Sequence, residues 1–117
     1  PDRIDFISPH GSSTPLNDSA ESRAIKDVLG ERAYDVPISG TKPYYAHALG
    51  ASGAIEIAIT CLAMERGWIP PTLNFEAGDD ACDLDPEHGR EHRPTTALSN
   101  SFGFGGLNAA LVLQSTS

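Results

Sequence analysis

The sequence is poor in the features that mark several large classes of protein. Its 117 residues include only two cysteines. Two are too few for a disulfide-stapled secreted scaffold, so a reducing, cytosolic setting is the simpler expectation. The longest nearly apolar stretch, 54–64, contains a glutamate and falls short of the roughly 20 residues that cross a bilayer. The first ten residues have neither a basic start nor an apolar centre, so we expect no signal peptide.

Positive charge is also scarce. Eight Lys and Arg stand against sixteen Asp and Glu, which gives a formal net charge of −8. A surface this acidic repels nucleic-acid phosphates and anionic lipid headgroups, and no run of basic residues offers a local exception. We therefore expect neither nucleic acid nor a membrane among its partners.

The residues that are present alternate between strand-like runs and helical patterns, which predicts an α/β protein with no internal domain boundary. A helix capped by Asp18, with Glu21 three residues later, is expected to end at Gly30. A second helix is expected from about 51 to 66. The predicted strands are 4–6, 36–39, 95–101 and 108–114, and the segment 76–91, with seven of the sixteen acidic residues, reads as a solvated connection.

The second predicted helix is unusual because it is apolar on every side. Eight of the ten residues 55–64 are apolar, so no solvent-facing side remains, and Cys61 lies on this buried helix. One other helix and about four strands cannot enclose it, which indicates that the chain is part of a larger body. Glu56 on the same helix needs a partner for its buried charge, and Lys42 is the candidate.

The first of three candidate chemical clusters is the sequence PHGSSTPLNDSAE at 9–21. Ser12 or Ser13 could act as a nucleophile with His10 as its base, but the segment lacks the G-x-S-x-G turn that exposes such a serine. The alternative is a loop whose hydroxyls cap the following helix.

The second cluster places Lys42 and His47 just ahead of the buried helix. The partial positive charge of a helix N-terminus keeps a nearby histidine neutral and able to donate one hydrogen bond, which suits an oxyanion. Gly50 and Gly53 permit close approach of other backbone to the helix start, although simple helix packing explains them equally well.

The third cluster is NSFGFGGLN at 100–108. It differs from a dinucleotide or phosphate loop, because its glycines lie between two predicted strands and no G-K-[ST] follows. The loop either presents backbone N–H groups and Phe104 to a cavity or is an ordinary hairpin. A zinc site at His88 and His92 with nearby Cys82 is disfavoured, since the stretch is interrupted by Pro and Gly and has no HExxH motif. We expect no metal and no cofactor.

Together, the three clusters resemble the β-ketoacyl-acyl carrier protein synthases, the condensing enzymes of fatty-acid and polyketide synthesis. The segment 10–18 is similar to the family's first histidine motif, usually HGTSTPLND. Residues 40–56 resemble the second histidine motif, and 100–106 the C-terminal Gly-rich loop. The resemblance covers nearly the whole chain. Modular polyketide synthases usually read HGTGT at the first motif, so the pattern favours the elongating synthases of discrete-subunit fatty-acid systems.

The resemblance implies a thiolase-like fold, a five-layer α-β-α-β-α body of two similar halves, with residues 1–117 as the C-terminal half. It implies a decarboxylative Claisen condensation of malonyl-acyl carrier protein with an acyl-enzyme. His10 and His47 would hydrogen-bond the malonyl thioester oxygen, and Lys42 would support the site by pairing with Glu56.

Further residues receive roles only through the same resemblance. Phe104 would contribute a backbone N–H to the oxyanion hole and gate the acyl pocket with its ring. The hydroxyls of Ser12 and Thr14 would contact the pantetheine arm. Three glycines of the C-terminal loop would support the site structurally: Gly103, Gly105 and Gly106.

The main departure from the family is that its nucleophilic cysteine and surrounding motif are absent, and neither Cys61 nor Cys82 matches that position. We therefore expect the chain to be inactive alone. Its expected partners are acyl carrier protein and the N-terminal half that carries the cysteine, with a homodimer when complete. Smaller departures are Ser12 for the usual Thr, and 43–46, where Ser and Gly are commoner. The alternatives are a polyketide-type ketosynthase portion and a non-catalytic half-domain that binds acyl carrier protein.

Overall fold

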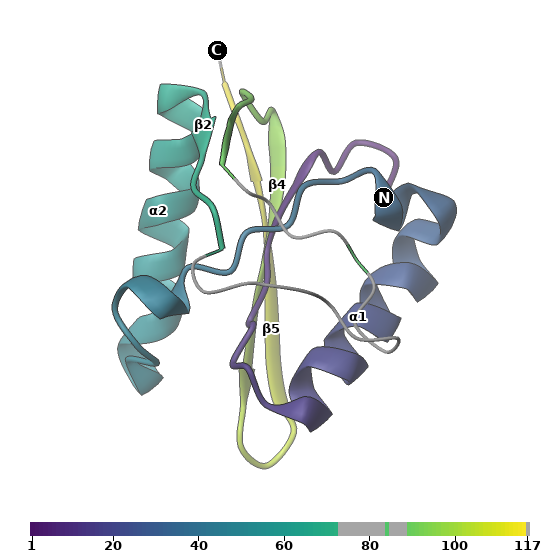
Figure 1. The fold of residues 1–117 in the computed structure, drawn as a ribbon, viewed down its shortest axis with the longest axis vertical. Coiled ribbons are helices and arrows are strands. Elements are labelled where there is room, and N and C mark those ends of the chain that lie inside the picture. Colours follow the sequence, from purple (N-terminus) through teal and green to yellow (C-terminus); the bar gives the residue numbers. More distant parts are fainter. Residues whose placement is uncertain (73–83, 85–88, 117) are drawn as a thin grey trace.

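The protein is described by a computed structural model that covers residues 1–72, 84 and 89–116. Its central element is a sheet in the order β1-β4-β5 (Figure 1). Strand β4 (Thr96–Gly103) pairs parallel to β1 (Phe6–Ser8) and antiparallel to β5 (Leu107–Gln114). The hairpin of β4 and β5 confirms the two strands predicted at 95–101 and 108–114, with slightly longer bounds.

The segment 36–39, predicted as a strand, contributes a single parallel bridge, between Ile38 and Ile7 of β1. The Ile7 N–H donates to the Pro37 carbonyl at 2.9 Å, and the Ser39 N–H donates to the Ile7 carbonyl at 3.1 Å. Pro37 has no N–H to donate, which shortens the pairing. The segment still aligns the chain that follows it with the end of β1.

Two fifteen-residue helices lie on opposite sides of the sheet (Figure 1), α1 (Pro15–Leu29) and α2 (Ser52–Arg66). Neighbouring residues of β1 face the two helices alternately, as the pleat of a strand requires. Ile7 belongs to the apolar cluster that includes Ile25 and Leu29 of α1, and Phe6 to the one that includes Ala63 of α2. The predicted α/β class is confirmed.

The shorter elements connect these layers. A 3₁₀ turn, Gly30–Tyr34, follows α1, and two more, Lys42–Tyr44 and Leu49–Ala51, precede α2. Strands β2 (Trp68–Ile69) and β3 (Arg90–Glu91) form an antiparallel pair beyond the end of α2. Most of the predicted acidic connection 76–91 lies outside the described residues.

The predicted start of α1 is wrong. The helix begins at Pro15, and its N-cap is Thr14, whose hydroxyl accepts the Asn17 N–H at 3.3 Å. Proline is well suited to the first helical position because its missing N–H would be unpaired there anyway. Asp18 therefore lies inside the first turn, and Glu21 is free for a longer-range contact. The predicted end is confirmed, since the Gly30 N–H donates to the Lys26 carbonyl.

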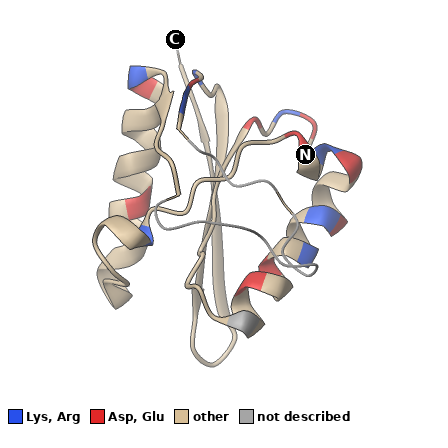
Figure 2. Cartoon of the chain, in the orientation of Figure 1, with Lys and Arg blue, Asp and Glu red and all other residues tan. Residues whose placement is uncertain are grey.

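Helix α2 is buried on one side only in this chain. Glu56, Thr60 and Ala63 are buried, whereas Leu62 is 50% exposed. Cys61, on the same helix, is also exposed in this chain. Figure 2 shows several charged residues along α1 but few on α2. The exposed face of α2 is therefore largely apolar, in agreement with the expectation that this chain is too small to enclose the helix.

Candidate functional site

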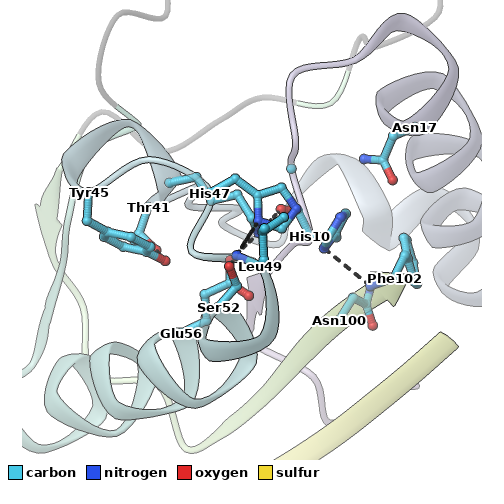
Figure 3. A network of polar contacts seen from close by, with 12 residues as sticks. His10, Asn17, Thr41, Tyr45, His47, Leu49, Ser52, Glu56, Asn100 and Phe102 are labelled. Atoms are coloured by element: carbon cyan, nitrogen blue, oxygen red, sulfur yellow. Dashed lines mark hydrogen bonds and ion pairs between the residues drawn. The ribbon is translucent and has the colours of Figure 1, made fainter. Parts of the chain in front are cut away.

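The site lies where the segment after β1 meets the segment before α2. We call residues 9–14 the His10 loop and residues 45–51 the His47 loop. The two imidazole rings approach edge to face, with centroids 5.3 Å apart and planes at 78° (Figure 3). The structure thus brings together two histidines from motifs that are 37 positions apart in the sequence.

The His10 loop is held by a buried carboxylate on α1. Glu21, 4% exposed, accepts the backbone N–H of His10 at 2.8 Å and that of Gly11 at 3.0 Å. The Asn100 side chain of β4 donates to the same carboxylate at 3.3 Å. Hydrogen bonds to a charged acceptor are stronger than neutral ones, so this contact fixes the loop between α1 and β4.

The protonation state of His10 follows from its surroundings. The Phe102 N–H of β4 donates to Nδ1 of His10 at 3.2 Å, so we assign the ring proton to Nε2. Burial lowers the pKa of His10 below the ordinary 6.5, and repulsion from Lys42 and His47 acts in the same direction against a smaller opposing effect of Asp18. A lowered pKa keeps the imidazole neutral at neutral pH.

In the His47 loop, hydrogen bonds from nearby residues likewise occupy Nδ1 of the histidine ring. Ala46 and Leu49 have positive φ values of 65° and 50°, and this turn directs the Leu49 N–H to Nδ1 of His47 at 3.1 Å. Nδ1 is therefore unprotonated, and the Ser52 hydroxyl, 3.0 Å away, donates to it as well. From these contacts we assign the ring proton of each histidine to Nε2, and neither Nε2 atom has a hydrogen-bond partner among the described residues.

Lys42 connects the His10 loop to α2. Its ammonium donates to the carbonyl of His10 and to Oε1 of Glu56 on α2. The predicted Lys42–Glu56 pair is therefore confirmed, and both side chains are buried, at 6% and 1% exposure. Burial raises the pKa of Glu56, while the Lys42 ammonium opposes that shift. The second carboxylate oxygen, Oε2, has no partner among the described residues.

Residues 43–46 precede His47, and the first two of them belong to the 3₁₀ turn Lys42–Tyr44. The Tyr44 hydroxyl donates to the Pro71 carbonyl at 2.8 Å, and the Tyr45 hydroxyl lies 3.1 Å from the hydroxyl of Thr41. Ala46 takes the left-handed conformation that glycine adopts without cost. The contacts of Tyr44 and Tyr45 thus attach the turn and the start of the His47 loop to their surroundings.

The structure also places the other expected site residues. The Ser12 hydroxyl lies 3.2 Å from that of Thr14, within the His10 loop. Phe104 is at the tip of the β4–β5 hairpin and 97% exposed, so within this chain it is Phe102, not Phe104, that contacts His10. Gly105 and Gly106 turn the hairpin with φ values of 81° and 80°, which favour glycine. The glycine at 53 permits the close approach of β4, since a Cβ there would lie 3.3 Å from the Ser101 hydroxyl.

Three residues that hold the histidines were not found from the sequence: Glu21, Ser52 and Phe102. Glu21 was assigned to a capping box, and its real partners are a long-range contact that no local pattern encodes. Phe102 acts through its backbone N–H, which leaves no sequence signal. Ser52 lies five residues after His47 at the first turn of a helix, and this spacing could have indicated the contact.

Two residues of the disfavoured zinc site, His88 and Cys82, lie outside the described residues. The Nε2 atom of His92 is 3.3 Å from the Asp5 carbonyl. Within ranges 1–72 and 89–116, no group of three or more His, Cys, Asp or Glu is placed to hold a metal ion. None of the helices in these ranges is long and apolar enough to span a membrane.

Comparison with known proteins identifies the family. A family model described as the C-terminal domain of β-ketoacyl synthase matches residues 1–76. The 3-oxoacyl-[acyl-carrier-protein] synthase 2 of Coxiella burnetii is 50% identical over 116 residues, 97% of this chain and 28% of that protein. The tetracenomycin polyketide synthase ketoacyl synthase alpha subunit of Streptomyces glaucescens is 50% identical over 114 residues, 96% of this chain and 27% of that protein.

Solved structures agree. A type II polyketide ketosynthase in complex with its acyl-carrier protein matches 99% of this chain and 29% of its own, with a TM-score of 0.95 and 43% identity. A β-ketoacyl synthase from Burkholderia phymatum matches 99% of this chain and 28% of its own, with a TM-score of 0.89 and 39% identity. The fold is that of the corresponding part of these thiolase-like ketosynthases, and the chain spans less than a third of their length. The chain therefore belongs to the β-ketoacyl synthase family, in which it matches the C-terminal domain.

Proposed function

We propose that this chain is the C-terminal part of a 3-oxoacyl-[acyl-carrier-protein] synthase that condenses malonyl-acyl carrier protein with an acyl-enzyme in fatty-acid biosynthesis. One observation carries the proposal: two imidazoles from separate loops lie 5.3 Å apart between centroids, and each accepts a backbone N–H at Nδ1. Each ring is left with an Nε2–H to donate. Two converging donors suit a substrate oxygen that gains negative charge.

Decarboxylation of a malonyl thioester creates such an oxygen. The bond between the carboxylate and Cα breaks, CO2 leaves, and the electron pair delocalises onto the thioester oxygen as an enolate. Donors fixed in advance stabilise that charge without reorganising. The enolate carbon then attacks the acyl thioester on the nucleophilic cysteine, which belongs to the proposed N-terminal half, and expels the cysteine thiolate. Because this chain lacks that cysteine, we propose that it is inactive alone.

The other roles belong to the same proposal. The hydroxyls of Ser12 and Thr14, which belong to the same loop as His10, would contact the pantetheine arm of the carrier protein. Lys42 would set the distance between the two loops and the charge around them. Phe104 would contribute its N–H and ring where the N-terminal half meets the hairpin, which is consistent with its near-complete exposure here.

The test uses the enzyme completed by its N-terminal half and measures CO2 release from malonyl-acyl carrier protein. Replacing His10 or His47 by Ala should lower the rate by at least about 100-fold, because each removes an oxyanion donor. His92→Ala, remote from the site, is the control and should leave the rate unchanged. Near-normal turnover in either site variant would refute the proposal. Carrier-protein binding without turnover by the wild type would favour the non-catalytic alternative.

Polyketide condensation is the second candidate, because the tetracenomycin ketosynthase is as similar to this chain as the fatty-acid synthase of Coxiella burnetii, both at 50% identity. The two functions share the decarboxylation step and differ in what happens next. Mass spectrometry of products formed without reducing enzymes distinguishes them. One condensation per loaded acyl group supports fatty-acid elongation, whereas repeated condensation to an unreduced poly-β-ketone supports the polyketide role.

A further inference from the structure

His47 is exposed, so burial does not set the orientation of its ring. In the His47 loop the side chains of Ala46, His47 and Leu49 are all exposed, so little packing restrains the imidazole. Its only described ring neighbour is His10, at 5.3 Å between centroids. Its orientation must therefore come from the hydrogen bonds to Nδ1.

Two donors converge on that single nitrogen. The Leu49 N–H reaches it from two residues along the chain, and the Ser52 hydroxyl reaches it from the first turn of α2 (Figure 3). The two differ in what fixes them. Leu49 belongs to the loop itself and has a positive φ, whereas Ser52 is 3% exposed and part of a regular helix. Of the two donors, only the Ser52 hydroxyl connects the His47 ring to a regular helix, α2.

We propose that Ser52 is a positioning residue for the decarboxylation step, whose hydroxyl holds His47 in the orientation and tautomer that direct Nε2–H at the substrate. The inference rests on the proposed function for its catalytic readout, but not for its structural one. Without this hydroxyl the ring would keep one local hydrogen bond and could swing with its loop. Nδ1 would also become available to carry the proton part of the time.

The experiment compares three variants in the completed enzyme. Ser52→Ala removes the hydroxyl and suits a helix start, and Ser52→Thr keeps the hydroxyl. Thr60→Val is the matched control: Thr60 lies on the same helix, is 1% exposed, and its hydroxyl donates to the Glu56 carbonyl at 2.7 Å. Removing that hydroxyl perturbs α2 without touching His47.

The first readout is kinetic. Ser52→Ala should lower kcat for CO2 release about five- to tenfold, the effect of one lost hydrogen bond, with little change in KM. Ser52→Thr should recover most of the rate, and Thr60→Val should stay near wild type. Equal losses in Ser52→Ala and Thr60→Val would overturn the proposal, because they would indicate general weakening of α2. An unchanged rate in Ser52→Ala would overturn it as well.

The second readout is spectroscopic and independent of turnover. Two-bond ¹H–¹⁵N correlation spectra of histidine-labelled enzyme report which ring nitrogen carries the proton. Wild type and Ser52→Thr should show His47 protonated at Nε2 only, and Ser52→Ala should show averaging toward the Nδ1–H tautomer. An unchanged spectrum in Ser52→Ala contradicts the inference. If wild type shows the expected tautomer but releases no CO2, the proposed function fails while the contact to Ser52 remains supported.

Discussion

The His10 loop and the His47 loop leave the same group, an Nε2–H, without a partner among the described residues, but they achieve this by different physical means. The His10 loop is fixed by long-range contacts to buried or strand groups: the Glu21 carboxylate, the Lys42 ammonium and the Phe102 N–H. The His47 loop is largely exposed and relies on left-handed backbone and short-range hydrogen bonds. Burial therefore controls the Nε2–H donor of His10, and local turn geometry controls that of His47. Each loop should respond to a different perturbation.

The largest expected effect comes from breaking the anchor of the His10 loop. Glu21→Ala leaves the N–H groups of His10 and Gly11 without their acceptor, which should lower the free energy of unfolding by about 3 kcal/mol. Urea unfolding of the completed enzyme, monitored by circular dichroism, measures this loss. Asp27→Ala, an exposed acidic residue on the same helix, is the matched control and should change stability by less than about 0.5 kcal/mol. A similar small change in both variants would show that the carboxylate does not hold the loop.

A pH titration should detect the burial of His10. Because the pKa of His10 is lowered in the folded protein, the unfolded chain binds its proton first as the pH falls. The free energy of unfolding should therefore decrease as the pH falls through about 6.5 and level off below the folded pKa. Burial raises the pKa of Glu56 and acts in the opposite direction.

The His10→Asn variant separates the two contributions, because it retains Glu56. The stability difference between wild type and His10→Asn should shrink as the pH falls from 7, in urea unfolding series at matched ionic strength. A difference that stays constant over this range would mean that His10 titrates alike in the folded and unfolded states.

The smallest expected effect concerns the His47 loop. Ala46 has a φ of 65°, which costs an L-residue about 1 kcal/mol, so Ala46→Gly should raise the free energy of unfolding by about 0.5 to 1 kcal/mol. Ala48, two residues on, has a φ of −80°, and Ala48→Gly should lower stability by a similar amount. Opposite signs in urea unfolding would support the strain at position 46, and equal losses would exclude it.

Local sequence rules predicted the two helices and the β4–β5 hairpin, whereas the strand predicted at 4–6 lies at Phe6–Ser8. Gly30 ends α1, and the Gly-rich tip joins β4 to β5, because both depend on conformations that glycine adopts easily. The start of α1 was wrong because two capping patterns overlap at 14–21. The one built on Thr14 and Pro15 prevails, since Glu21 is engaged by the His10 loop. The strand predicted at 36–39 is reduced to a single bridge, because Pro37 has no N–H to donate to β1.

The site was predictable where charge or an entire motif marked it. The Lys42–Glu56 pair followed from the cost of an isolated buried carboxylate, and the resemblance to ketosynthases singled out both histidines. The contacts of Phe102 and Glu21 to the His10 loop could not be predicted, because they depend on how α1 and β4 meet in space.

Strand β5 has a consequence for handling this chain by itself. It is the terminal strand of its sheet, eight residues long, without a charged residue, and Leu107 and Val112 on it are 75% and 62% exposed. The free backbone N–H and C=O groups of a long, uncharged edge strand can pair with the same strand of another copy. We therefore expect the isolated polypeptide to aggregate through intermolecular β-pairing, and co-expression with the proposed N-terminal half to be the practical route to soluble material.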